Sequence, residues 1–196
     1  MTASRRLTLA ALAVALVQIG ILSWMIVGRA TILRDGREVV LEVQPVDPRD
    51  LLRGDYVRLG YNVSSLPAEL FGEAGMTTEP EPLADGLVVF VRLRAGADGV
   101  WQAVAAARGA PPPAAPQPGD VDMRGTADYW PGPSARAVSV SYGIERFYLP
   151  EGQGRAIEAD LRERRFRMKV AVAGDGTAQI KAFYDGDALI YSEPLY

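Results

Sequence analysis

The sequence contains no cysteine and no histidine. The first absence excludes disulfide bonds, thiolate metal ligands and cysteine nucleophiles, and the second excludes imidazole catalysis and histidine metal centres. Lys and Arg number 21 against 24 Asp and Glu, which gives a formal net charge of −3. We therefore expect no broad basic surface for nucleic acid. Without His or Cys only oxygen ligands remain for a metal, and no carboxylate cluster has coordination spacing, so we expect no metal; no other cofactor is predicted either.

A membrane anchor is predicted at the start of the chain, whose 196 residues otherwise suffice for one domain. Leu7 to Val27 is a run without charge, and Gln18 is its most polar residue. As a helix it would span roughly 31 Å, close to the ~30 Å of bilayer hydrocarbon. We assign residues 1–28 to a membrane-embedded anchor and residues 29–196 to a separate domain.

The anchor is longer than the apolar core of a cleavable signal peptide, and it does not end in a small-residue cleavage site. Trp24 lies near its far end, where an indole favours the membrane interface. Arg5 and Arg6 precede the run and Arg29, Arg34 and Arg37 follow it, so the Lys/Arg count on the two sides is nearly balanced. So short a tail favours an N-terminus inside the cell with the domain outside. Ala11 and Ala15 would let a second helix approach closely, or they simply belong to an alanine-rich helix.

The chain after the anchor has the pattern of antiparallel strands joined by tight turns. Asp-Gly pairs, which favour the type I′ turns of hairpins, occur at residues 35–36, 85–86, 98–99, 175–176 and 185–186. The predicted strands cover residues 39–43, 87–94, 100–107, 135–140, 144–149, 166–173, 177–184 and 188–191. We therefore expect a mainly β or α+β fold: one transmembrane helix followed by one antiparallel β-rich domain.

One short helix is predicted within that domain at residues 156–164, because Ile157 and Leu161 lie one turn apart on a single face. Residues 77–85 and 109–119 are predicted as loops. The second loop contains five prolines, so it should be extended and poorly packed. It is either a long hairpin excursion or a ligand for a proline-binding module.

Residues 46–63 form the most informative segment, and they begin with a predicted turn. Asp47 can cap a helical turn with Pro48 at its first position, and Gly54 can end it in a left-handed conformation. The other charged residues of this turn are Arg49, Asp50 and Arg53. Together with Asp55 they could line a binding site, or they could cap, pair and solvate a surface turn.

A strand follows from Asp55. Its alternation places Leu59 and Tyr61 on the side that faces the core, and Tyr56 on the more polar side. The two tyrosines should therefore point in opposite directions.

Residues 54–61, Gly-Asp-Tyr-Val-Arg-Leu-Gly-Tyr, resemble the pattern that gives the GDYXXLXY family its name. Residues 47–53 and 142–152 are also similar to that family, and the resemblance covers most of the chain. It implies a bacterial, membrane-anchored protein of uncharacterised function, with a multi-pass membrane protein as partner. The resemblance carries no catalytic residue with it.

Two further hypotheses concern carboxylates. Glu145 and Glu151 could act as an acid–base pair if their carboxyl groups converge. Asp185 and Asp187 could begin a calcium site, although the rest of a calcium loop is missing and a hairpin turn is the simpler interpretation.

The enzymatic alternative is a membrane-bound serine peptidase of the signal-peptidase type, which also joins an anchor to a β domain. In those enzymes the serine and the lysine precede a Gly-Asp box, whereas Lys169 and Lys181 follow it here. Ser64, Ser65 or Ser141 could still meet Lys181 to form a dyad. The sequence favours a non-catalytic envelope protein that binds a membrane partner, anchored in the bacterial cytoplasmic membrane.

Overall fold

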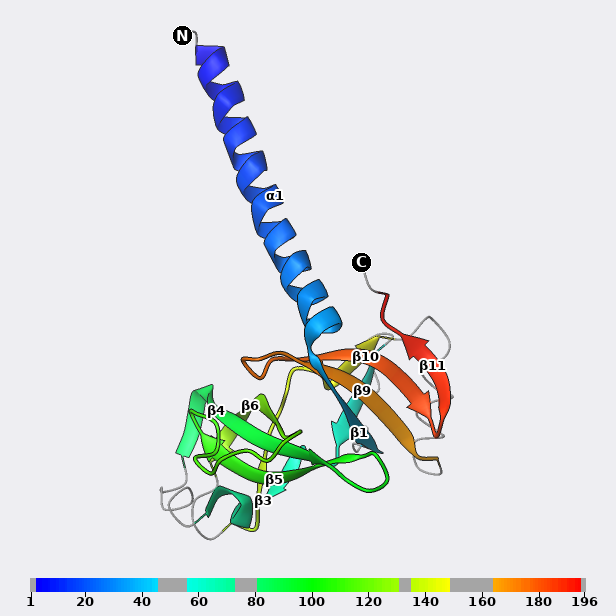
Figure 1. Ribbon diagram of the computed structural model, residues 1–196. Helices are drawn as coiled ribbons and strands as arrows, with labels where there is room; N and C mark the ends of the chain where they lie inside the picture. The colour runs from blue at the N-terminus through cyan, green and yellow to red at the C-terminus, as the bar shows by residue number, and fades with distance from the viewer. Residues whose placement is uncertain (1–2, 46–55, 73–80, 131–134, 149–163, 195–196) are drawn as a thin grey trace.

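The computed structural model describes residues 3–45, 56–72, 81–130, 135–148 and 164–194. Helix α1 (Ala3–Asp35) projects from a domain built of β strands (Figure 1). The strands of the described residues form sheets of six, three and two strands, paired antiparallel throughout. The predicted fold class is thereby confirmed. The helix predicted at residues 156–164 lies outside the described residues, apart from Arg164.

Helix α1 runs almost directly into strand β1 (Arg37–Pro45), with only Gly36 between them. The N–H of Gly36 donates to the carbonyl oxygen of Ile32 at 2.9 Å. A Cβ at this position would lie 2.4 Å from that oxygen, so glycine lets the chain leave the helix without a linker. The Asp35-Gly36 pair therefore ends a helix, and the hairpin turn predicted there is wrong.

The last turns of α1 attach the helix to the domain through β9 (Phe166–Val172) and β10 (Ala178–Asp185). Leu33 is fully buried, and Arg29 pairs with Glu193 at 3.1 Å. By contrast, every side chain from Leu9 to Arg29 is exposed.

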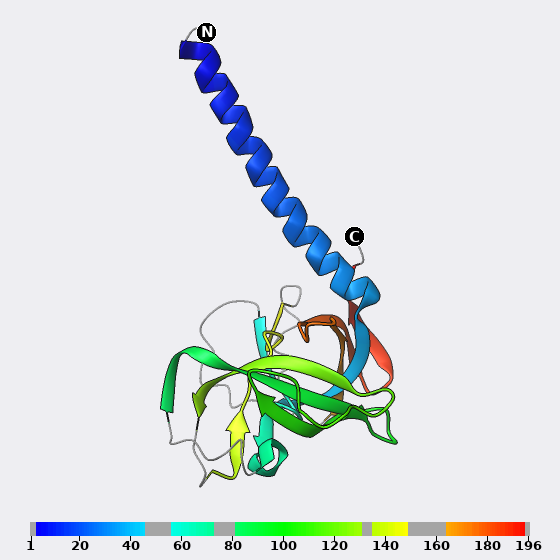
Figure 2. The same cartoon turned by 60° about the vertical axis from the view of Figure 1, so that its left-hand side comes forward.

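The largest sheet has the order β11-β10-β9-β1-β2-β8, in which β2 is Tyr56–Tyr61, β8 is Arg146–Tyr148 and β11 is Ala188–Ser192. It is strongly curved, as two views show (Figures 1 and 2). The curvature brings its outermost strands together, because the rings of Phe147 on β8 and Tyr191 on β11 pack edge-to-face with centroids 5.2 Å apart.

The second sheet places β4 (Glu81–Ala95) between β5 (Trp101–Arg108) and β6 (Val121–Trp130). Two of its features differ from the predictions. Strand β6 was not predicted, and residues 81–85 belong to β4 although they were assigned to a loop. Strands β3 (Ser65–Pro67) and β7 (Ala137–Ser139) form the small third sheet, and a single 3-10 turn, η1 (Ala68–Phe71), follows β3.

One hydrophobic core joins the sheets. It includes Leu41 from the first sheet, Val91 and Met123 from the second, and Val138 from the third, all fully buried. Backbone contact adds to it, since Arg124 on β6 donates its N–H to the Gly176 carbonyl in the β9–β10 turn at 2.8 Å. The three sheets therefore share one core.

Three of the five Asp-Gly pairs form hairpin turns, as predicted. Gly99 joins β4 to β5, Gly176 joins β9 to β10, and Gly186 joins β10 to β11, each with a positive φ. Gly86 also has a positive φ, of 71°, but it lies inside β4 at a register shift against β6. The Asp85-Gly86 pair therefore introduces a bulge rather than a turn.

The proline-rich segment 109–119 connects β5 to β6, which lie on opposite sides of β4. It is a crossover rather than the predicted hairpin excursion. Most of it is exposed, but Pro112 is buried. The guanidinium of Arg92 on β4 donates to the carbonyl oxygens of Pro112 and Ala114, so the crossover is fixed to the sheet that it passes.

Candidate functional site

The described parts of the two blocks that resemble the GDYXXLXY pattern, residues 56–61 and 142–148, lie side by side, although some 80 residues separate them in the sequence. Strand β2 pairs with β8, with Tyr56 opposite Tyr148 and Arg58 opposite Arg146. The N–H of Leu59 extends the contact by donating to the carbonyl oxygen of Glu145 at 2.8 Å. The conjunction of these blocks defines the candidate site, which we call the motif junction: residues 56–64 and 141–148.

Tyr61 lies at the centre of the motif junction. It is buried, with 1% of its surface exposed, and its hydroxyl donates to the Ile144 carbonyl oxygen at 2.6 Å. Burial raises the pKa of its phenol well above the ordinary value, and the negative charge of Glu145 raises it further. The hydroxyl therefore stays protonated and acts as a structural donor.

Tyr142 has the same environment. Its hydroxyl donates to the Val63 carbonyl oxygen at 2.6 Å, and burial followed by the charge of Glu145 raises its pKa. The Glu145 carboxylate accepts hydrogen bonds from the backbone N–H groups of Tyr142 and Gly143. Gly143 has a φ of +79°, so this carboxylate closes a tight turn at a position that favours glycine. Glu145 is thus engaged with backbone, and Glu151, its predicted acid–base partner, lies outside the described residues.

Two polar side chains complete the junction. Ser64 accepts a hydrogen bond from the N–H of Tyr61 at 3.1 Å. Asn62 accepts from the N–H of Glu42 at 3.2 Å and donates to the carbonyl oxygen of Trp101 at 2.8 Å. Asn62 therefore links the first sheet to strand β5.

The sequence-predicted site residues are placed as follows. Leu59 and Tyr61 belong to the core, as predicted, with 2% and 1% exposed. The backbone of Tyr56 lies in β2, but its side chain is not among those described. Outside the described residues lie Asp47, Arg49, Asp50, Arg53, Gly54 and Asp55. The capped turn therefore stays a prediction. Sequence reasoning did not assign a role to Tyr142, although the family-like block 142–152 contains it.

Lys169 and Lys181, the candidate bases of a Ser-Lys dyad, share one carboxylate. Glu38 lies 3.3 Å from the Nζ of Lys169 and 2.7 Å from the Nζ of Lys181. Burial alone would lower the pKa of Lys169, but Glu38, and Tyr184 beside it, raise the pKa above the ordinary value. A lysine base needs a lowered pKa, so this environment holds Lys169 in its charged form.

A buried ion pair lies on the second sheet. Arg92 is 4% exposed, and its guanidinium makes a two-pronged contact with the carboxylate of Asp122 at 2.8 Å for each prong. Together with the carbonyls of the crossover, this satisfies most of its donors. The arrangement positions the crossover and leaves little capacity for an external ligand.

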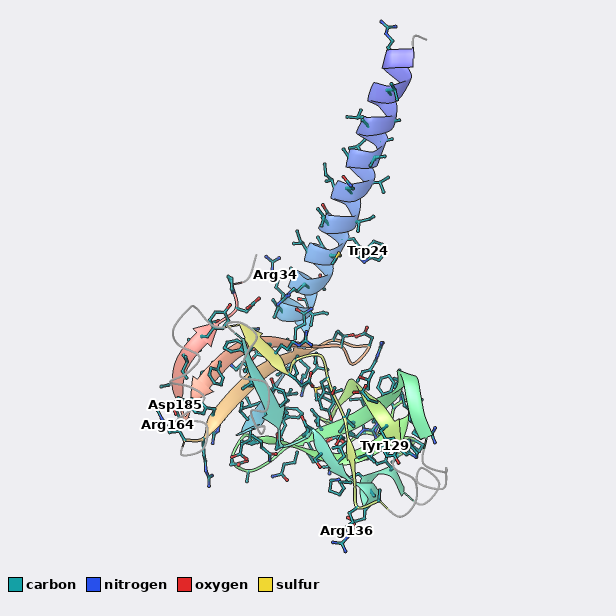
Figure 3. The ribbon with its side chains drawn as sticks, turned by 180° about the vertical axis from the view of Figure 1, so that it is seen from behind. Trp24, Arg34, Tyr129, Arg136, Arg164 and Asp185 are labelled. Carbon is teal, nitrogen blue, oxygen red and sulfur yellow. The ribbon has the colours of Figure 1, made fainter. Side chains whose placement is uncertain are left out.

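The hypothetical calcium site at Asp185 and Asp187 has a different role. Asp185 pairs with Arg164 (Figure 3), and Asp187 in the β10–β11 turn lies 3.7 Å from Arg167 on β9. Among the described residues, no group of three or more Asp or Glu side chains is arranged to hold a metal ion.

A family model described as "GDYXXLXY protein" matches residues 18–183, most of the chain. No curated protein and no solved structure matches. The matched range includes both halves of the motif junction and the second half of α1.

Proposed function

The chain belongs to the GDYXXLXY family, and from this premise we propose that it is a membrane-anchored, non-catalytic protein of the bacterial envelope. In this proposal α1 crosses the cytoplasmic membrane, and the β domain binds a membrane protein on the outer side. The partner proposed is a multi-pass membrane protein.

The observation that carries the proposal is the free-standing apolar helix. Leu9–Asp35 is long and apolar enough to cross a membrane, and its apolar stretch packs against none of the described domain. Trp24 is 82% exposed, and the leucines and isoleucines around it are more than half exposed. So large a continuous apolar surface is unfavourable in water, whereas a bilayer solvates it.

The orientation proposed places the N-terminus inside the cell. Arg5 lies ahead of the apolar run, and in this orientation it faces the cytoplasm, as the positive-inside rule favours. The domain then lies outside, where Arg29 already pairs with Glu193 on the domain side of the membrane.

A binding role is favoured over catalysis by what the motif residues do. In the described part of the motif, Leu59 is packed in the core and the Tyr61 hydroxyl is bonded to backbone. Both residues therefore build the domain. The serine-peptidase alternative needs an uncharged lysine, and the pairing of Lys169 and Lys181 with Glu38 weighs against it.

Membrane insertion and orientation are tested in one set of cells. The full-length chain should stay in membranes washed with alkaline carbonate. A Ser65→Cys variant adds the chain's only thiol at an exposed site of the domain. We expect a membrane-impermeant maleimide to label it in spheroplasts without lysis. Labelling only after lysis would overturn the orientation, and carbonate extraction would overturn the anchor.

The partner is tested by cross-linking in native membranes, followed by detergent solubilisation and affinity purification of the chain. We expect an integral membrane protein to be cross-linked to the domain. A Lys169→Met, Lys181→Met double variant should retain that protein, because the proposal gives the lysines no catalytic role. The double variant is also tested for its ability to replace the unmodified protein in cells that lack it. If it binds the partner but fails to replace the unmodified protein, the peptidase alternative is favoured.

A further inference from the structure

Gln18 lies at the middle of the apolar run that the proposed function places in the membrane. Its carboxamide offers two donors and an acceptor oxygen, and within the described residues it has no hydrogen-bond partner. In a bilayer centre no water can supply one, so an isolated carboxamide there is unfavourable. A polar partner at the same depth in the bilayer would satisfy the hydrogen bonds of the Gln18 carboxamide.

The residues around Gln18 allow close approach of a second helix. Spacings of four, three and four residues place Ala11, Ala15, Gln18 and Leu22 on one face of α1. The first two have the smallest side chains on this face, so a neighbouring backbone can come near enough for the carboxamide to reach across. Trp24 projects from the side of α1 (Figure 3), and its position six residues after Gln18 places it on the other side of the helix.

We propose that this face of α1 binds the same face of a second copy of the chain, in parallel, with the two Gln18 carboxamides hydrogen-bonded to each other. The inference rests on the proposed membrane anchor. A second copy inserted in the same orientation presents its own Gln18 at the same depth. The carboxamide is also self-complementary, since each copy can donate with its NH₂ group and accept with its oxygen.

We call the contact between the two Gln18 faces the seam. The charges at its domain end are compatible with a parallel pair. Arg29 lies on the same face, eleven residues after Gln18, and two bare cations there would repel each other. Each Arg29 is paired with Glu193 of its own chain at 3.1 Å, which offsets that repulsion. The parallel pair therefore brings together two neutralised groups.

The opposite face is the natural control. Gly20 lies there, in a shallow hollow lined by Val17, Ile21, Trp24 and Met25, the last of which follows Gln18 by seven residues and so borders the contact face. A large, highly exposed indole beside such a hollow suits contact with lipid at the interface. Ala13 lies on that side, so Ala13 and Ala15 are chemically matched positions on opposite faces.

The test uses the absence of cysteine in the chain. Ala15→Cys and Ala13→Cys are made separately in the full-length protein, reconstituted in phospholipid vesicles and oxidised mildly. A disulfide requires Cα atoms within roughly 7 Å, so only a position in the seam can be bridged. We expect a covalent dimer from Ala15→Cys and none from Ala13→Cys.

The second comparison varies the carboxamide. In the Ala15→Cys background, Gln18→Leu should weaken dimerisation about threefold or more, whereas Gln18→Asn should retain it. Equal cross-linking on both faces, or no effect of Gln18→Leu, would overturn the proposal. A cross-link that forms only in native membranes, to another protein, would overturn the second copy as occupant. Carbonate extraction of the same variants separates the two failures: a retained chain without cross-links refutes the dimer alone, and an extracted chain refutes the anchor and the dimer together.

Discussion

Tyr61 and Tyr142 hold the motif junction reciprocally: each donates its hydroxyl to the carbonyl oxygen of the residue two positions beyond the other. The acceptors are Ile144 and Val63, and both bonds are 2.6 Å long. Since both phenols are buried, each bond replaces contacts with water that the chain gives up on folding. The pair fixes β2 against the turn before β8 and so joins residues 56–61 to residues 142–148.

Removal of either hydroxyl should destabilise the domain. Tyr61→Phe and Tyr142→Phe keep the ring but leave a buried carbonyl without its donor, so we expect each to lower the free energy of unfolding by about 1–3 kcal/mol. Urea titration of the full-length chain in detergent measures this. Tyr129→Phe is the control, because Tyr129 is 52% exposed and should change little (Figure 3). Equal stability of all three variants would contradict a structural role for the two buried phenols.

Gly125 on β6 should not tolerate a side chain. A Cβ there would lie 2.5 Å from Cγ1 of Val140 and 2.8 Å from the carbonyl oxygen of Ser141. We expect Gly125→Ala to destabilise the domain by about 1–3 kcal/mol through overpacking. Gly174→Ala is the matched control, since a Cβ at Gly174 meets nothing within 4 Å. The melting temperature of Gly174→Ala should equal or slightly exceed that of the unmodified protein.

The buried guanidinium of Arg92 on β4 should hold the crossover, residues 109–119, in place. Arg92→Met removes the partner of Asp122 and the donors to the carbonyls of Pro112 and Ala114, and we expect a loss of about 3 kcal/mol. Limited proteolysis should then cut within residues 109–119 faster than in the unmodified protein. Arg136→Met, at an exposed position, should alter neither stability nor cleavage. Unchanged cleavage in Arg92→Met would show that the crossover is held in another way.

Asp120 predicts an acid-dependent loss of stability. Its hydrogen bonds to Arg94, and then the N–H of Gln117, lower its pKa to about 2, whereas an unfolded Asp has a pKa of about 3.9. The stabilisation is therefore complete above about pH 4 and is lost as the pH falls towards 2. Between these values the melting temperature should fall more steeply for the unmodified protein than for Asp120→Asn. Parallel curves would contradict this linkage.

Much of the β framework could be predicted from local patterns. The strands with alternating β-branched residues were found, and three Asp-Gly pairs formed the expected turns. Strand β6 was missed because Gly125 and Ala127 occupy two of its core-facing positions, so the alternation of hydrophobicity is weak. Small residues are required there because neighbouring segments approach closely, and local sequence does not reveal such packing.

The contacts of the motif junction between residues far apart in the sequence could not be predicted. Alternation along β2 was enough to place Leu59 and Tyr61 in the core. It could not identify the acceptor of the Tyr61 hydroxyl, because Ile144 comes close only through the antiparallel pairing of β2 with β8. For the same reason the burial of Arg92 was not predicted, because Asp122 and the crossover reach it from other segments of the chain.

The junction between α1 and β1 fixes the distance between the β domain and the apolar part of the helix. With only Gly36 between helix and sheet, and with Leu33 buried in the domain, there is no tether on which the domain could swing outward. If the helix leaves the hydrocarbon near Val27, the eight residues to Asp35 set a stand-off of only about 12 Å. The domain could then touch only surfaces that lie close to the lipid headgroups. Any rotation of α1 about its axis would also rotate the whole domain, because the helix is joined to the domain without a flexible segment.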